Sequence, residues 1–215
     1  NRGIDTNGAS YYTDLDTAGE SVDYDGNKGS TIVGAAAVVA GSNGNAAGAA
    51  INIADIDKDF TASIQNADIK ADTVLAEADA DTLLVGASGG IAAGTKTFGG
   101  MGSVTWQDID NDVTAQFVNS QITTNAATAK ADNNTQAINV AGSVSVGKSA
   151  AAGATLAYNA LDNTIGAYMK GNSITALGDD VDVVVDADNT GKVYGIGAGV
   201  SASTKAAING SVAVN

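Results

Sequence analysis

A short acidic phrase that returns at an almost constant step constrains the fold of this chain more than any other feature. An apolar residue followed by Asp stands at Ile4, Ile56, Ile109, and, with Leu, at Leu161. The steps between these positions are 52, 53 and 52 residues. Self-similarity at a fixed period marks a repeat architecture, in which each unit buries its apolar side against the next unit. The sequence therefore predicts one repeat array instead of a single globular core.

The step divides the whole chain into copies. We expect a partial copy at 1–29, full copies at 30–81, 82–135 and 136–190, and a partial copy at 191–215. The irregular, Tyr-rich first thirty residues fit the same step, which places Ile4 on Ile56, Tyr12 on Ile64, Val22 on Val74 and Ile32 on Leu84. Because the chain begins and ends inside copies, we interpret it as a window of a longer protein.

Within each copy the apolar residues alternate with polar or small ones. Val104 and Trp106 show this period of two, as do Val113, Ala115 and Phe117, and then Val183 and Val185. Alternation of β-branched and aromatic residues predicts strands, and the Asn, Asp, Gly and Ser clusters between them predict turns. The chain has no Pro, which suits ladders in which every residue donates its amide. No segment reads as a helix, so we expect an all-β fold.

Strands that align copy on copy predict a parallel β-solenoid, also called a β-helix. A single coil of ~53 residues at ~3.3 Å each would run ~175 Å around, which we take to be too wide for side chains to fill. We therefore expect about two coils per ~52-residue repeat, a rod roughly 35–40 Å long and a narrow core of Val, Ile, Ala and Gly. Equivalent residues should stack on one another: Ile53, Trp106, Tyr158 and Val214 in one row, and Phe60, Val113 and Ile165 in another.

Composition excludes several classes of function. Asp and Glu number 24 against 10 Lys and Arg, a net charge of -14. This opposes binding to nucleic acid or to an anionic membrane, since both need basic groups. There is no Cys for disulfides or thiol chemistry, and no His as general base or metal ligand. The uncharged stretch 29–54 is long enough to span a bilayer, but its Ser, Thr and Asn residues argue against membrane insertion.

Two motifs imitate nucleotide sites. Residues 142–149 match the P-loop pattern, yet the intervening Val and Ser alternate like a strand, whereas a phosphate loop must lead into a helix. Lys148 is better explained as a turn lysine, repeated at Lys96 and Lys205. The glycines at 195, 197 and 199 lack the dinucleotide spacing and lie in a predicted strand. We expect no nucleotide cofactor.

The repeated phrase supplies the metal candidates. Its carboxylates recur at alternate positions, the spacing of calcium-loop oxygens: Asp55, Asp57, Asp59, Asp108, Asp110 and Asp112. The Gly and Glu that an EF-hand loop requires are replaced by Phe60 and Asn66. Solvated turn aspartates are therefore our first interpretation, and weak calcium binding is the alternative. No catalytic residue stands out, and we expect no enzyme activity.

The cycle of Val-Gly-Ala, a turn, Gly-Ser-Val-x-aromatic, Asp-x-Asp, Val-x-Ala-x-apolar and Val-x-Val-x-Ala-Asp resembles the repeat region of leukotoxin-type filamentous adhesins. These are large cell-surface proteins of Gram-negative bacteria, secreted by the autotransporter (type V) route. The resemblance covers essentially the whole chain and brings no catalytic motif. It implies an exported β-solenoid passenger at the outer cell surface, with an adhesive or spacer role.

We therefore expect a structural or adhesive segment of a secreted filamentous protein, acting as a rigid stalk or as an adhesion surface. Its partner would be a protein or glycan of a host or neighbouring cell. Two other classes stay open. A polysaccharide-active β-helix enzyme would show clustered carboxylates in a cleft. A self-assembling fibre or surface-layer subunit would join end to end through open strand edges.

Overall fold

The chain folds almost entirely into long strands. The computed structural model describes residues 3–4, 10–11, 15–25 and 30–215, and side chains from residue 31 onward. The strands are β1 (Gly3–Ile4), β2 (Ser10–Tyr11), β3 (Leu15–Asp25), β4 (Ser30–Ser42), β5 (Ala46–Gln65), β6 (Asp68–Gly94), β7 (Phe98–Val118), β8 (Gln121–Thr124), β9 (Ala126–Gly147), β10 (Ala150–Lys170), β11 (Ser173–Ala176), β12 (Asp182–Ser203) and β13 (Ala206–Val214). This confirms the all-β prediction, and no membrane-spanning helix occurs among the residues described.

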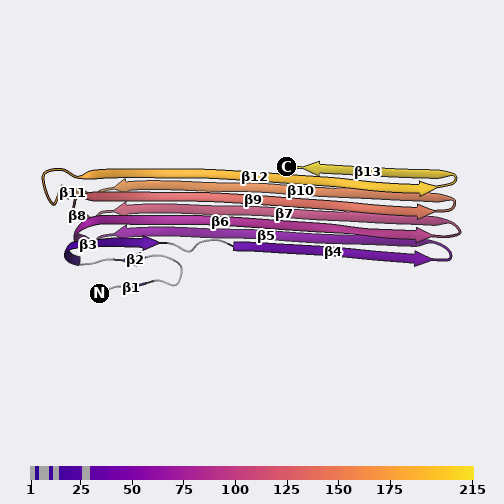
Figure 1. Cartoon of the computed structure of the whole chain (residues 1–215), viewed down its shortest axis with the longest axis horizontal. Coiled ribbons are helices and arrows are strands. Elements are labelled where there is room, and N and C mark those ends of the chain that lie inside the picture. Colours follow the sequence, from indigo (N-terminus) through magenta and orange to yellow (C-terminus); the bar gives the residue numbers. More distant parts are fainter. Residues whose placement is uncertain (1–2, 5–9, 12–14, 26–29) are drawn as a thin grey trace.

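Two parallel sheets make up the body of the molecule. In the first sheet β6 pairs with β9 and β9 with β12, β3 and β4 lie on the other edge of β6, and β8 and β11 extend the sheet at one end. In the second sheet the order is β13-β10-β7-β5. The chain alternates between the sheets, so strands of the first sheet run to the right in Figure 1 and those of the second run to the left. All strand pairs within these two sheets are parallel.

The strand register shows that each repeat makes one circuit, not two. Asp55 pairs with Asp108, 53 residues on, and Asp110 pairs with Asp162, 52 residues on. Thr73 likewise pairs with Ala126 in the first sheet, again a step of 53. A repeat therefore contributes one long strand to each sheet and one strand spacing, ~4.8 Å, to the stack. The expectation of two coils per repeat is wrong.

The error lay in assuming a round coil. A circuit of ~53 residues can be flattened, so that two strands of about 20 residues lie face to face with only ~10 Å between their sheets. Side chains then need to fill a thin gap and not a wide lumen. Figure 1 shows the result as a slab whose longest axis follows the strands. The stack of layers is correspondingly shorter than the rod we expected.

The predicted stacking rows are confirmed. Ile53 pairs with Trp106, Trp106 with Tyr158, and Tyr158 with Val214. The second row, Phe60, Val113 and Ile165, is equally continuous. Val22 lies opposite Val74 and Ile32 opposite Leu84, where the 52-residue step places them. The division of the chain into copies at the boundaries given above stays a prediction.

The first residues depart from the repeat. Gly3–Ile4 pairs antiparallel with Ser10–Tyr11 in a separate two-stranded sheet, so Ile4 does not continue the ladder toward Ile56. Tyr12 lies outside the described residues. Two short antiparallel segments can close a hairpin locally, without a partner from another copy. This local pairing replaces the stacking that the sequence step suggested for Ile4.

The corners of the circuit are stacked like the strands. Asn66 and Asn119 have φ of 51° and Gly171 has φ of 68°, the left-handed region that Asn and Gly tolerate best. The amide of Asn66 donates to the carbonyl of Val118, and that of Asn119 to Lys170, so the ladder continues round the bend. After β11 an insertion lengthens one corner, and the step from Ala126 to its partner Asp182 becomes 56 residues.

An apolar core fills the corner end of the slab. Its largest members are Ile64, Ile69, Phe117 and Ile122, all with 1% exposure or less, and a layer of inward alanines packs between them. Leu84, Ile56 and Ile109 form a smaller cluster next to it. Each fully buried side chain of this size contributes ~1.5–3 kcal/mol to folding. This end has the inside-apolar, outside-polar pattern of an ordinary sheet pair.

At the other end of the slab the pattern is reversed. The inward residues of β7 and β9 include Thr105, Gln107, Asn139 and Ser145, all with no measurable exposure. The outward neighbours are apolar: Val104, Val140, Val144 and Val146 alternate with them. The expectation of a core filled by Val and Ile holds at the corner end and fails here.

Hydrogen bonds across the gap explain the polar interior. Gln107 Nε2 donates to the carbonyl of Ile138 at 3.2 Å, and Asn139 Nδ2 to the carbonyl of Tyr158 at 2.8 Å. Glycine makes room for these amides. A Cβ on Gly86 would stand 2.4 Å from Gln107 Nε2, and one on Gly34 2.9 Å from Asn52 Oδ1. Small residues therefore let the sheets approach, and amides bond where bulky side chains would otherwise fill the space.

Candidate functional site

Seven carboxylates form a regular array on the outer face of the second sheet. We call this the aspartate grid: Asp55, Asp57, Asp59, Asp108, Asp110, Asp112 and Asp162. All seven are exposed. Residues two apart on a strand point to the same face, ~6.6 Å apart, and in-register partners lie ~4.8 Å apart. The fold thus brings all six predicted metal candidates onto one surface and adds Asp162, which the sequence interpretation had left out.

Mutual repulsion marks the centre of the grid. The pKa of Asp110 lies above its ordinary value, first because of desolvation and then because of repulsion by four neighbours: Asp112, Asp162, Asp57 and Asp108. Like charges directly opposite each other on a sheet are destabilising. The grid therefore concentrates negative charge at a cost in stability, which points to a use other than holding the fold.

The grid is flat, and flatness bears on calcium. Calcium takes six to eight oxygens that converge at 2.3–2.6 Å. No group of three or more acidic side chains with metal-binding geometry is found within the described part of the chain. Weak calcium binding by Asp55, Asp57, Asp59, Asp108, Asp110 and Asp112 stays a prediction.

An aromatic pair borders the grid. Trp106 and Tyr158 stack with ring centroids 3.9 Å apart and an interplanar angle of 24°. They occupy the row between the apolar part of this face and the first aspartates, Asp55 and Asp108, and Trp106 is 39% exposed. A rigid aromatic surface beside hydrogen-bond acceptors suits a ligand with one apolar face and several hydroxyl donors.

A lysine lies behind the grid. Lys58 belongs to the same strand as Asp57 and Asp59 but points into the slab, where its Nζ donates to Thr82 Oγ1 at 3.0 Å. Desolvation lowers the pKa of Lys58 below its ordinary value. The alternation of the strand could have indicated this inward position, since residues 57 and 59 share one face and residue 58 must take the other.

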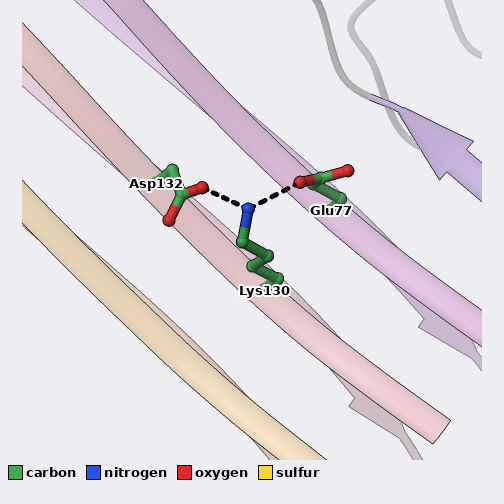
Figure 2. Close-up of polar contacts among 3 residues, drawn as sticks. All are labelled: Glu77, Lys130 and Asp132. Carbon is green, nitrogen blue, oxygen red and sulfur yellow. Dashed lines mark hydrogen bonds and ion pairs between the residues drawn. The ribbon is translucent and has the colours of Figure 1, made fainter.

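The first sheet carries its own charged rows. Figure 2 shows Lys130 of β9 between Glu77 of β6 and Asp132 of its own strand. Lys130 Nζ lies 2.9 Å from Glu77 Oε1 and also contacts an Asp132 oxygen. Hydrogen bonds to these two carboxylates hold the pKa of Lys130 well above its ordinary value. The lysine ties neighbouring layers together on a face that is otherwise acidic here.

The nucleotide-like motifs lie in strands and turns. Residues 142–147 belong to β9 and residues 195–199 to β12, so neither leads into a helix. Lys148 lies in a turn that is stacked between two equivalent turns: its amide donates to Gly94, and its carbonyl accepts from Thr204. The interpretation of Lys148 as a repeated turn lysine is confirmed by this ladder.

Sequence reasoning missed the largest hollow. On the outer face of the first sheet four small residues in register form a row that we call the trench: Ala37, Gly89, Gly142 and Ala198. The adjacent row of larger residues, the ridge, consists of Val39, Ile91, Val144 and Val200. They line an open hollow of about 690 Å³ whose lining holds no charged residue. Aligning the copies at the 53-residue step would have shown both rows.

Comparison with protein-family models, with curated proteins and with solved structures finds no match for this chain.

Proposed function

We propose that this chain is a structural and adhesive segment of a secreted, filamentous cell-surface protein of Gram-negative bacteria, an autotransporter passenger. In this proposal the two sheets are the walls of a flattened β-solenoid at the outer cell surface. The observation that carries it is the register. Every repeat returns to the same position one layer higher, so each outward row presents one kind of residue along the stack.

The geometry favours an adhesion surface over a stalk. One circuit adds ~4.8 Å of height for ~53 residues, half the rise that two coils per repeat would give. The same circuit adds a strip about 20 residues long to each of two faces. A chain built this way is inefficient at making length and efficient at making broad, repetitive surface.

The face with the aspartate grid suits a glycan partner on a host or neighbouring cell. The Trp106–Tyr158 stack offers a flat apolar surface to a sugar ring, and the carboxylates beside it accept hydrogen bonds from hydroxyls. Adhesion of this kind requires no catalytic group, cofactor or metal. A protein partner would meet the same face through basic side chains.

A glycan and host-protein binding screen tests the proposal. The chain should bind one class of glycan saturably, and Trp106→Ala should weaken that binding by about tenfold or more. Tyr194→Ala is the matched control, because Tyr194 is an exposed aromatic residue on the other sheet. Equal binding by wild type and Trp106→Ala would remove the aromatic row from the adhesive surface. Absence of binding by the wild type would reduce the segment to a spacer.

The raised pKa of Asp110 keeps a polysaccharide-active enzyme as the alternative. A general acid needs a pKa above that of its neighbours, and carboxylates ~4.8 Å apart across strands approach the ~5–5.5 Å of retaining glycosidases. Release of reducing sugar from polysaccharides, abolished by Asp110→Asn, would replace adhesion with catalysis. End-to-end assembly as a fibre or surface-layer subunit, the other alternative, would appear as filaments in electron microscopy.

A further inference from the structure

The outer face of the first sheet is apolar over an unusually large area. Four successive outward rows, each crossing β4, β6, β9 and β12, contain only Ala, Gly, Val and Ile. Beside the trench and the ridge these rows hold Ala35, Ala87, Val140 and Ile196 on one side, and Gly41, Ala93, Val146 and Ala202 on the other. Several are strongly exposed: Val39 by 84%, Val200 by 61% and Ile196 by 56%. Patches of this kind mark interaction sites.

The shape of this face fits a copy of itself. The ridge stands directly beside the trench, one outward row apart. A two-fold axis parallel to the stack, placed midway between the two rows, would seat the ridge of each copy in the trench of the other. It would also pair the row of Ala35 with the row of Gly41. Self-complementary surfaces of this kind make isologous dimers.

The area is sufficient for such a dimer. Four rows ~6.7 Å apart and four strands ~4.8 Å apart cover about 500 Å² per copy, so the pair would bury about 1,000 Å². That reaches the lower limit for a specific interface. Every further repeat in the stack would enlarge it by one more strand.

The distribution of charge selects the orientation. Along β6 the acidic rows of Glu77, Asp79 and Asp81 precede the apolar rows. Strands of two copies that ran in the same direction would set these acidic rows against each other. Antiparallel strands, with the axis beside the ridge, place each acidic row beyond the end of the partner. The net charge of -14 is then compatible with association.

We propose that the trench and ridge of the first sheet bind the same rows of a second copy of this chain, face to face and with antiparallel strands. This lateral contact uses no strand edge, so it differs from end-to-end assembly. It is also independent of what the aspartate grid binds on the opposite sheet.

Sedimentation equilibrium of the purified chain over a range of concentrations tests the proposal. The wild type should show a monomer–dimer equilibrium. Val200→Lys should raise the dissociation constant about tenfold or more, since it places a charge in the ridge. Val184→Lys is the matched control: it is also an exposed, outward Val of β12 but lies outside the apolar rows, and it should leave the constant unchanged.

A second variant separates a specific fit from general stickiness. Gly142→Val fills the trench while keeping the face apolar, and a Cβ there meets only ordinary contact, 3.7 Å from the Ala198 carbonyl. The ridge–trench fit predicts a weaker dimer. An unchanged or tighter dimer would overturn the proposal. A monomeric wild type would overturn it too, and binding of that monomer to phosphatidylcholine vesicles would identify the face as a lipid-binding surface instead.

Discussion

Single glycines set the distance between the two sheets. Gly86 faces Gln107, a fully buried amide whose Nε2 is bonded to Ile138. No backbone conformation requires glycine at this position; the constraint is the space in front of it. The sequence shows that glycine is abundant, but only the pairing of the sheets shows which glycines face an amide.

Gly86→Ala should destabilise the protein by about 1–3 kcal/mol, because the new methyl group forces Gln107 to move and to lose its bond. Urea unfolding, followed by circular dichroism, measures the change. Gly102→Ala serves as the control, since a Cβ at Gly102 meets nothing within 4 Å. Equal stability of the two variants would show that the gap between the sheets is not tightly filled.

Asp110→Asn should stabilise the protein at neutral pH and low salt, because it removes the central charge of the grid. The folded-state pKa of Asp110 is raised, so the folded state holds this proton more tightly than the unfolded state does. Stability therefore falls as pH rises from the ordinary value of 3.8 through the folded pKa. The variant should flatten this part of the pH profile and reduce the gain in melting temperature that salt gives the wild type.

Asp68→Asn removes one charge outside the grid and is the control for this experiment. A gain from Asp68→Asn as large as that from Asp110→Asn would attribute the effect to net charge alone, not to the grid.

Individual strands show how much the sequence could predict. The period of two gave the strands, and the repeat step gave their register, as the row of Trp106 and Tyr158 shows. It did not give which side of a strand faces inward. In β9 the alternation of Ser143, Val144, Ser145 and Val146 would place the valines inside, yet the structure places the serines there. Cross-gap hydrogen bonds and the facing glycines decide the choice, and both depend on the opposite sheet.

Lys130 joins two neighbouring strands, so its effect belongs to this scale. Lys130→Met keeps the stem but leaves Glu77 and Asp132 facing each other without a cation. Stability should fall by about 0.5–1 kcal/mol, and more at low salt. Because the folded pKa of Lys130 is raised, its contribution is complete below the ordinary value of 10.5 and is lost only at higher pH.

Thermal unfolding between pH 6 and pH 9 checks the Lys130 prediction. Lys96→Met, which removes a lysine from an exposed turn, is the control. A loss that grows or vanishes within this pH range would contradict the assignment, as would an equal loss in both variants.

The whole molecule is defined by one circuit per repeat. The sequence predicted the repeat and the parallel stacking but not the number of circuits, because its argument compared perimeters and a flattened coil has little lumen. The candidate site divides in the same way. The six aspartates were found from their spacing, whereas their assembly into one grid required the register of β5 on β7.

Deletion of a full repeat tests the circuit directly. Removing residues 74–126 joins Thr73 to Ala127, which is equivalent to Val74 in the register. The shortened chain should fold and be one layer, ~4.8 Å, thinner in small-angle scattering. Removing only residues 74–99 should prevent folding, because it joins a strand of one sheet to a strand of the other. Tolerance of that half-repeat deletion would restore the picture of two coils per repeat.

The stacking of the layers has a mechanical consequence. Tension applied between the two ends of the stack peels off one circuit at a time, and each circuit that opens releases ~53 residues, or about 180 Å of extended chain, in place of ~4.8 Å of folded height. A surface anchored through such a segment would lengthen by nearly forty times its folded rise before its backbone became taut. Single-molecule pulling should record force peaks spaced by this increment, and peaks spaced by half of it would contradict the one-circuit repeat. In a cell under flow, the layers would act as an extensible tether that absorbs load in discrete steps.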